Sequence, residues 1–209
     1  MIGIVDYGSG NVFSLMSALK VLGHDAKLVT SAAEIRNVSK IILPGVGAFP
    51  SAMGKLFEKD LFEAVKETIE NRHALGICVG MQIMLSTGEE FVTTKGLDVI
   101  PGKVTKLSIN DSDLPKRKLP HIGWAPVNFT PQSGQAHPMT MGIKAGDEFY
   151  FAHSFHATPD NQNDIIMTAN YGHQFAAAVA RGTIFGAQFH PEKSGEVGLR
   201  FLDNFCNLS

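Results

Sequence analysis

The first eighty residues alternate short apolar runs with longer segments of helical period. Apolar runs occupy residues 2–5, 27–29, 41–43 and 74–77, and amphipathic helices are expected over residues 12–22 and 51–70. Strands and helices that alternate in this way form a parallel sheet with right-handed crossovers and helices on both faces. The pattern therefore predicts a doubly wound fold, and this is the strongest constraint that the sequence places on the structure.

From residue 104 onward, the sequence changes to short β-rich segments separated by glycine and proline. They cover residues 104–109, 125–129, 148–152, 165–169 and 176–180, and Ser194 is expected to cap a last helix over residues 196–205. We therefore expect an α/β fold with a doubly wound, mostly parallel central sheet flanked by helices, and with additional antiparallel strands in the second half. The 209 residues, 44% of them hydrophobic, predict one domain over residues 1–209.

One cysteine stands between two glycines in the run Gly-Ile-Cys-Val-Gly-Met-Gln at residues 76–82. This run follows an apolar strand and precedes a helix-like segment over residues 81–85, so Cys78 is predicted to lie on a sharp strand-to-helix turn that exposes its side chain. A helix N-terminus also favours a thiolate over a thiol. The alternative is that Cys78 is a small buried hydrophobic residue, which is the commoner fate of a free cysteine.

A base for such a nucleophile is available near the end of the chain. His190 follows the apolar run 183–187, and Glu192 lies two residues further on, with Pro191 between them. A thiolate, an imidazole that moves the proton and a carboxylate that fixes the imidazole form a triad. Cys78, His190 and Glu192 are therefore the predicted catalytic residues, and the alternative for His190 is a structural histidine of the core.

These two motifs resemble those of the class I, triad-type glutamine amidotransferases, which are glutaminases that supply ammonia to synthases. Four further segments, at residues 5–11, 44–49, 120–124 and 149–154, are similar to segments in the glutaminase subunits of imidazole glycerol phosphate synthases. The resemblance runs from Met1 to about Phe205. It implies hydrolysis of glutamine to glutamate and ammonia, without a cofactor, in the service of histidine biosynthesis.

The resemblance also implies which residues surround the substrate. A peptide of the segment Gly45-Val46-Gly47 is expected to supply an oxyanion donor beside the N–H of Val79. Backbone groups of Ser154 and Phe155 are expected to meet the α-carboxylate of glutamine. Gln82 lies one helical turn after Cys78 and can hydrogen-bond the substrate, although a solvent-facing helical glutamine is an equally good interpretation of the sequence.

In the resembled enzymes the partner is a (βα)₈-barrel cyclase, so a heterodimer is expected, with Asn11, Trp124 and Lys193 on the docking face. Two positions depart from the family pattern: Ala125 follows Trp124 where asparagine is usual, and Phe155 follows Ser154 where tyrosine is usual. The same glutaminase chemistry could therefore serve another synthase, such as a sugar amidotransferase of surface-polysaccharide biosynthesis.

Composition excludes several other classes. A net charge of −2 and a pI near 6.4 provide no basic surface for nucleic acid. Two cysteines form no disulfide framework, and no apolar run is long enough to cross a membrane, so a cytoplasmic protein is expected. His153 and His156 lack further ligands at metal-binding spacing, and no metal site is expected. A cysteine peptidase would share the triad, whereas a non-catalytic binding module would be expected to lose the thiol or the base.

Overall fold

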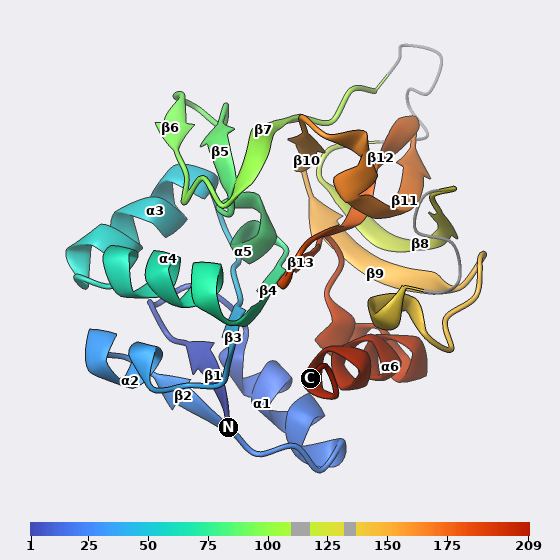
Figure 1. Ribbon diagram of the computed structural model, residues 1–209. Coiled ribbons are helices and arrows are strands. Elements are labelled where there is room, and N and C mark those ends of the chain that lie inside the picture. The colour runs from blue at the N-terminus through green and yellow to red at the C-terminus, as the bar shows by residue number, and fades with distance from the viewer. Residues whose placement is uncertain (110–117, 132–136) are drawn as a thin grey trace.

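A nine-stranded sheet forms the centre of the computed structural model, which describes residues 1–109, 118–131 and 137–209 (Figure 1). Its order is β2-β1-β3-β4-β13-β12-β11-β8-β9. Five neighbouring strands at one side of the sheet are parallel: β2 (Ala26–Val29), β1 (Ile2–Val5), β3 (Lys40–Leu43), β4 (His73–Ile77) and β13 (Ile184–Ala187). The remaining strands pair antiparallel: β12 (His173–Arg181), β11 (Ile165–Tyr171), β8 (His121–Phe129) and β9 (Glu148–His153).

Helices cover both faces of the parallel half, which confirms the doubly wound prediction (Figure 1). Helices α1 (Val12–Val21) and α6 (Gly195–Cys206) contact each other on one face. The other face carries α2 (Ala32–Arg36), α3 (Phe49–Glu58), α4 (Phe62–Asn71) and the short α5 (Val79–Gln82). Because both faces are covered, β1, β4 and β13 are apolar along most of their length instead of alternating.

The helix predicted over residues 51–70 is two helices, α3 and α4. The chain turns between them at Asp60, whose φ of 54° is left-handed and incompatible with a continuous helix. Asp tolerates this conformation better than most residues, so the polar Lys59-Asp60 pair was a turn signal inside an otherwise helical pattern. Helix α2, which begins with a capping box of Ser31 and Glu34, was not predicted at all.

The helix expected over residues 81–85 lies earlier than predicted, because α5 covers Val79–Gln82. The helix α5 ends at Gln82, and Leu85 already starts strand β5 of a second, four-stranded sheet, because Leu85 pairs with Ile100 in that sheet. The order of this sheet is β10-β7-β5-β6. Its strands are β5 (Leu85–Gly88), β6 (Thr94–Lys95), β7 (Ile100–Lys106) and β10 (Phe155–Pro159).

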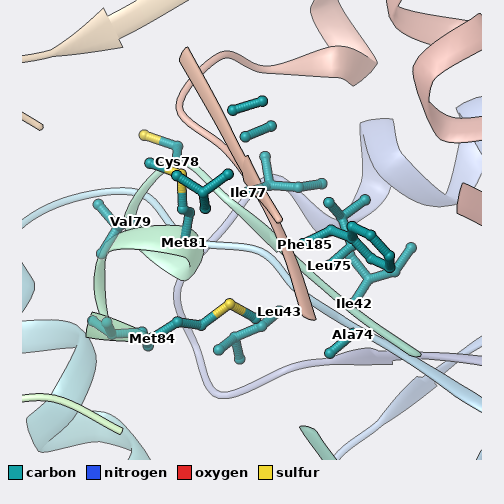
Figure 2. Packing of buried hydrophobic residues seen from close by; sticks show 14 of the residues in the cluster. Ile42, Leu43, Ala74, Leu75, Ile77, Cys78, Val79, Met81, Met84 and Phe185 are labelled. Atoms are coloured by element: carbon teal, nitrogen blue, oxygen red, sulfur yellow. The ribbon is translucent and has the colours of Figure 1, made fainter. Parts of the chain in front are cut away.

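Buried apolar residues beneath the Cys78 turn join the parallel strands to α5 (Figure 2). A second packed group connects β9 to α6 through Phe189, whose ring lies 4.1 Å from that of Phe149 and 5.0 Å from that of Phe201. Phe189 thereby anchors the segment that carries His190. Three 3₁₀ turns complete the described structure: Pro138–Thr140, Gln162–Asp164 and Pro191–Lys193. In the described parts of the chain, no helix is both long and apolar enough to cross a membrane.

Candidate active site

Cys78 lies on the turn that joins β4 to α5, at the carboxyl end of the sheet. Its backbone has φ 53° and ψ −114°, a combination that residues with a side chain rarely adopt. The neighbouring core holds this conformation in place: the Cys78 N–H donates to the carbonyl of Ala187 at 2.7 Å. The strained turn directs the thiol away from its own strand, as a nucleophile requires.

Both glycines of the Cys78 motif are required by close packing of the backbone. A Cβ atom on Gly80 would lie 1.7 Å from the carbonyl oxygen of Leu43, and one on Gly76 would lie 2.6 Å from the Cα of Met81. Any side chain at either position would push the turn away from β3 or from α5. The spacing Gly-x-Cys-x-Gly therefore has a steric cause in this fold.

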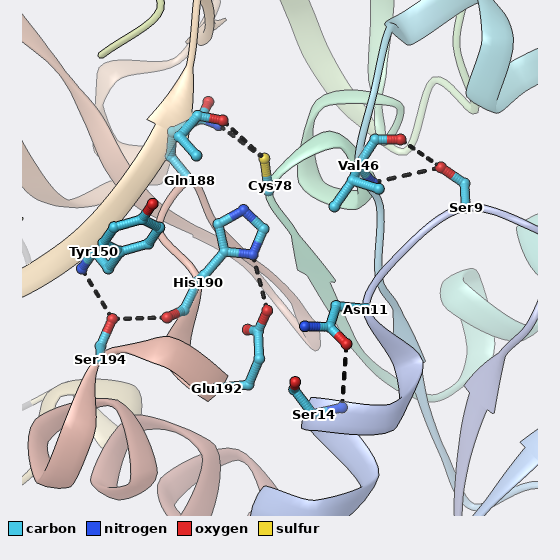
Figure 3. A network of polar contacts seen from close by, with 11 residues as sticks. Ser9, Asn11, Ser14, Val46, Cys78, Tyr150, Gln188, His190, Glu192 and Ser194 are labelled. Atoms are coloured by element: carbon cyan, nitrogen blue, oxygen red, sulfur yellow. Dashed lines mark hydrogen bonds and ion pairs between the residues drawn. The ribbon is translucent and has the colours of Figure 1, made fainter. Parts of the chain in front are cut away.

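His190 follows β13, the strand next to β4, and its ring nitrogen Nδ1 lies 2.9 Å from Oε1 of Glu192 (Figure 3). Both side chains are 4% exposed. The other ring nitrogen points toward the sulfur of Cys78. Adjacent parallel strands thus bring together two residues that are 112 positions apart in the sequence.

The environment of His190 favours its protonated form. Burial alone would lower the pKa of His190, but hydrogen bonds to Cys78 and Glu192 and the charges of these two groups raise the pKa to about 10. One oxygen of Glu192, Oε2, is buried and has no hydrogen-bond partner within the described structure. The carboxylate is therefore positioned mainly by the imidazole that it contacts.

Ser194 holds this segment in a way that the sequence analysis did not anticipate. The residue precedes α6, but its side chain makes no capping hydrogen bond to the helix, so the predicted cap was wrong. The hydroxyl instead donates to the carbonyl of His190 at 2.7 Å and accepts from the backbone N–H of Tyr150 at 3.0 Å (Figure 3). Ser194 thus connects the base to strand β9.

A cavity of about 170 Å³ opens beside Cys78 and His190. This volume lies below the range of about 300–1,000 Å³ that is usual for drug-sized ligands, so the cavity suits a small metabolite. It contains most of the residues that the sequence predicted for catalysis and substrate binding: Val46, Gly47, Cys78, Val79, Gln82, Ser154, Phe155 and His190. Lys193, which was predicted to face a partner, lines it too. Glu90, Ala152 and His153 also line it and were not predicted as site residues.

Gly45 lies behind this cavity. A Cβ atom there would be 2.6 Å from the backbone nitrogen of Gly80, so the loop after β3 packs directly on the nucleophile turn. Tyr7 holds the loop by donating its hydroxyl to the carbonyl of Pro44 at 2.7 Å, and burial raises the pKa of Tyr7 above its usual value. Tyr7 lies within the motif at residues 5–11, but the sequence alone gave no sign of this contact.

The wall opposite His190 is built from Gln82, His153 and Phe155. Gln82 is 2% exposed and donates to the carbonyl of Phe155 at 2.8 Å, so it does not face solvent. His153 lies 2.9 Å from the same carbonyl through Nδ1. Burial lowers the pKa of His153 to about 3, which outweighs the effect of this hydrogen bond, so the ring is neutral near pH 7.

Comparisons with known proteins identify the family of this chain. The family model of class-I glutamine amidotransferases matches residues 3–208. The chain belongs to the class I glutamine amidotransferase family. It is 42% identical to the imidazole glycerol phosphate synthase subunit HisH of Moorella thermoacetica, over 99% of this chain and 94% of that protein. Identity to the HisH subunit of Leptospira borgpetersenii is 40%, over the full length of both chains.

Solved structures show the same fold at lower identity. This amidotransferase superimposes on a crystal structure of a glutamine amidotransferase with a TM-score of 0.71 and 18% identity, over 98% of both chains. The structure of PurLQS from Thermotoga maritima aligns with a TM-score of 0.69 and 19% identity, over 99% of this chain and 97% of that one. At these identities, the likeness concerns the fold alone.

Of the three residues predicted to face a partner, Lys193 lines the cavity of this amidotransferase. Trp124 is 53% exposed, and its ring meets that of Tyr150 edge-on at 6.0 Å. The ammonium group of Lys193 lies 5.8 Å from the centre of the same Tyr150 ring. Tyr150 therefore joins two of the predicted interface residues and was itself missed. Asn11 caps α1 by accepting from the Ser14 N–H at 3.2 Å and lies near Glu192.

His156 lies away from the catalytic cavity, beside Thr105 and the ring of His173. Among the residues that the structure describes, no three histidine, cysteine, aspartate or glutamate side chains are grouped in a way that could hold a metal ion.

Proposed function

We propose that this chain is the glutaminase subunit of an imidazole glycerol phosphate synthase. The observation that carries the proposal is the end-to-end identity of 40–42% with HisH subunits, because it covers the whole chain and not only the catalytic motifs. The buried arrangement of Cys78, His190 and Glu192 supplies the chemistry that this assignment needs. We further propose that residues 1–209 act as one glutaminase domain.

In the proposed reaction, the Cys78 thiolate attacks the side-chain amide carbon of glutamine, and the carbonyl π electrons move to its oxygen. The N–H of Val79 belongs to the first turn of α5, so it has no helical acceptor and is free to stabilise this oxyanion. A peptide of the segment Gly45-Val46-Gly47 is proposed as the second donor. Val46 and Gly47 line the same cavity, and Gly47 has a φ of 97°.

His190 then transfers its proton to the departing nitrogen, which leaves as ammonia while the thioester forms. The neutral imidazole next takes a proton from water as the water oxygen adds to the thioester carbon. The C–S bond then breaks and its electron pair returns to the sulfur, which restores the Cys78 thiolate and the protonated His190. The product leaves as glutamate after its new carboxyl group loses a proton to solvent. Glu192 keeps the ring oriented through Nδ1 in both steps. The raised pKa of His190 favours the protonated form that the first step requires. No cofactor takes part in this scheme.

Substrate recognition is assigned to the opposite wall of the cavity. The carbonyls of Ser154 and Phe155 are already engaged, by the N–H of Leu107 at 2.8 Å and by Gln82 at 2.8 Å respectively. The backbone groups that these two residues can still offer are N–H donors. Donors suit the α-carboxylate of glutamine, in agreement with the role proposed for Ser154 and Phe155.

Free ammonia would mostly become ammonium at neutral pH, and ammonium is not a nucleophile. We therefore propose that the subunit docks onto a (βα)₈-barrel cyclase as a heterodimer and delivers ammonia through a closed path. The cyclase would use it to form imidazole glycerol phosphate and an aminoimidazole carboxamide nucleotide. The proposed docking face contains Asn11, Trp124 and Lys193, of which Lys193 lines the cavity. Because a nucleophilic thiol needs a reducing compartment, the cytoplasm is the proposed location.

The departure at Ala125 does not favour a different synthase. Ala125 is 4% exposed, so its side chain is part of the interior and not of the surface that a partner would touch. The partner would instead meet the neighbouring Ile122 and Trp124, which are 63% and 53% exposed. A sugar amidotransferase as the partner therefore gains no support from this position.

The test is synthesis by the chain reconstituted with a cyclase subunit, supplied with either glutamine or ammonium salts. Cys78→Ala is expected to reduce glutamine-dependent synthesis at least 10³-fold, because the covalent route is lost, while synthesis from ammonium salts continues. Cys206→Ala is the matched control, since Cys206 is also a buried free cysteine but lies in α6. Loss of both activities in Cys78→Ala would show that Cys78 is structural. Failure of the cyclase to bind, with retained glutaminase activity, would point to another synthase.

A further inference from the structure

Gln188 is a buried polar residue that the proposed mechanism does not use. It follows β13, two residues before His190, and its side chain is fully buried. Its amide nitrogen Nε2 lies 3.8 Å from the sulfur of Cys78 (Figure 3). The backbone is fixed as well, because the Gln188 N–H donates to the carbonyl of Ala177 at 2.9 Å. A buried amide needs partners for both its ends, so this placement requires an explanation.

The direction of each hydrogen bond around Gln188 is set by one backbone carbonyl. The oxygen of Phe155 can only accept, so the end of Gln82 that lies 2.8 Å away must be its NH₂ group. The same NH₂ group lies 3.1 Å from Gln188, which must therefore present its oxygen to Gln82. The NH₂ group of Gln188 is then the end that faces the sulfur. Reversing either amide would place two acceptors or two donors against each other.

His153 fixes the same carbonyl from its other side. Its Nδ1 lies 2.9 Å from the Phe155 oxygen and must donate to it, so Nε2 is the acceptor end of the ring. His121 completes the row, with Nδ1 at 3.4 Å from Nε2 of His153. A continuous buried network thus runs from the substrate wall to the nucleophile, and each member has a defined donor and acceptor.

We propose that Gln188 is a positioning residue for the nucleophile, which donates an amide N–H to the Cys78 sulfur, orients it and favours its thiolate form. A hydrogen bond to a charged acceptor is stronger than one between neutral groups, so the donor favours the thiolate over the thiol. The inference rests on the proposed role of Cys78 and adds the group that holds its sulfur.

The network has a consequence for substrate binding. Both N–H bonds of the Gln82 amide are used, one by Phe155 and one by Gln188. Gln82 lines the cavity, so the group that it can present there is its oxygen, an acceptor. An acceptor at this place suits the α-ammonium group of glutamine. Substrate binding and the orientation of the sulfur would then be linked through Gln82 and Gln188.

Other groups around the sulfur also affect its ionisation, and an experiment must hold them constant. The carbonyl of Ala152 lies 4.0 Å from the sulfur, and burial, together with the charge of Cys78, raises the pKa of Tyr7. Four titratable side chains line the cavity beside Cys78: Glu90, His153, His190 and Lys193. Tyr7 and Glu192 complete the set of titratable groups near the sulfur and its base. A change at Gln188 leaves all of them in place.

The test is the rate at which iodoacetamide alkylates Cys78 in the full chain as a function of pH, followed by mass spectrometry of the Cys78 peptide. Gln188→Met keeps the shape of the side chain but removes the donor. The pH of half-maximal alkylation is expected to rise by about one unit, and glutamine hydrolysis to fall about tenfold or more. Gln174→Met makes the same change at an exposed position of β12 and is expected to alter neither.

Gln188→Asn provides a second, uncharged variant if Gln188→Met does not fold, because its amide is one methylene shorter and no longer reaches the sulfur. An alkylation profile identical to that of the unaltered chain in a folded Gln188 variant would overturn the inference. This outcome is distinct from failure of the proposed function, which would appear as retained glutamine hydrolysis in Cys78→Ala.

Discussion

Two histidines face the same catalytic cavity from opposite walls, and their protonation differs. Hydrogen bonds to Cys78 and Glu192 raise the pKa of His190 to about 10 against the effect of burial. Burial lowers the pKa of His153 to about 3, because the partners of its ring are the neutral Phe155 carbonyl and His121. The residue type is the same, and the depth is similar. The carboxylate and thiol that contact one ring make it a proton donor, whereas the other ring contacts a carbonyl and a neutral histidine and stays a neutral structural group.

The difference also follows the two halves of the sheet. His190 comes directly after a parallel strand, beside the strand that ends in Cys78, where ligand sites of open α/β sheets usually lie. His153 ends β9, at the antiparallel edge of the sheet, and leads into β10 of the second sheet. The parallel half thus supplies the chemistry, and the antiparallel half supplies the wall against which the substrate would bind.

Replacing each histidine in turn tests this comparison most directly. His190→Ala is expected to reduce glutamine turnover by about 10²–10⁴-fold, because the group that moves the proton is lost. His153→Asn keeps an N–H near the position of Nδ1 and is expected to change turnover by no more than about threefold. Steady-state rates of glutamine hydrolysis measure turnover in both variants, and calorimetry checks that both still bind glutamine. Equal losses of turnover in the two variants would mean that both histidines take part in the proton transfer.

Glu192→Gln sharpens the same contrast by removing only the charge beside His190. The pKa of His190 is expected to fall, and turnover to decrease about 100-fold, or ~3 kcal/mol in the barrier. The folded-state pKa of His190 lies above its unfolded value near 6.5, so the stability from this contact is complete below pH 6.5 and lost as the pH rises toward 10. Urea unfolding at pH 6 and pH 10 should therefore separate the variant from the parent only at the lower pH. The same difference in unfolding free energy at both pH values would contradict the raised pKa of His190.

The smallest expected effect concerns His153 and acid stability. Its folded-state pKa is lowered, so the unfolded chain takes up a proton below pH 6.5 while the folded chain stays neutral until about pH 3. Stability is lost across this window, and His153→Asn is expected to recover about 1–2 kcal/mol at pH 5 relative to pH 7. Urea unfolding at the two pH values measures this. No gain at pH 5 would show that the ring becomes charged in the folded protein.

Much of the parallel half could be predicted from the sequence, because its strands are apolar runs with turn residues between them. The strands ending at Val5, Leu43 and Ile77 were placed within one residue at each end. The break at Asp60 was missed, because the helical period continues through it. Additional strands were expected in the second half, but neither strand β5 nor the early end of α5 could be read locally, since Leu85 becomes a strand residue only through its distant partner Ile100.

The candidate site shows the same division. Cys78, His190 and Glu192 were predicted from motifs in which spacing alone places the groups. Tyr7, His153 and Gln188 were not, because their importance comes from contacts with Pro44, Phe155 and Cys78 that are made only in the folded chain. The role of Ser194 was wrong for a similar reason: a helix cap was the local expectation, but the hydroxyl oxygen accepts from the Tyr150 N–H instead of from a helix N–H.

The pairing of β4 with β13 has a consequence for synthesis of the protein on the ribosome. A nascent chain that has passed Cys78 carries the reactive sulfur but must still add residues 79–187 before the neighbouring strand exists, and His190 follows only after that. Until then, the thiol lacks its base. Translation intermediates and prematurely terminated products would thus be unable to consume glutamine, which protects the cellular pool of this amino acid from incomplete copies of the enzyme.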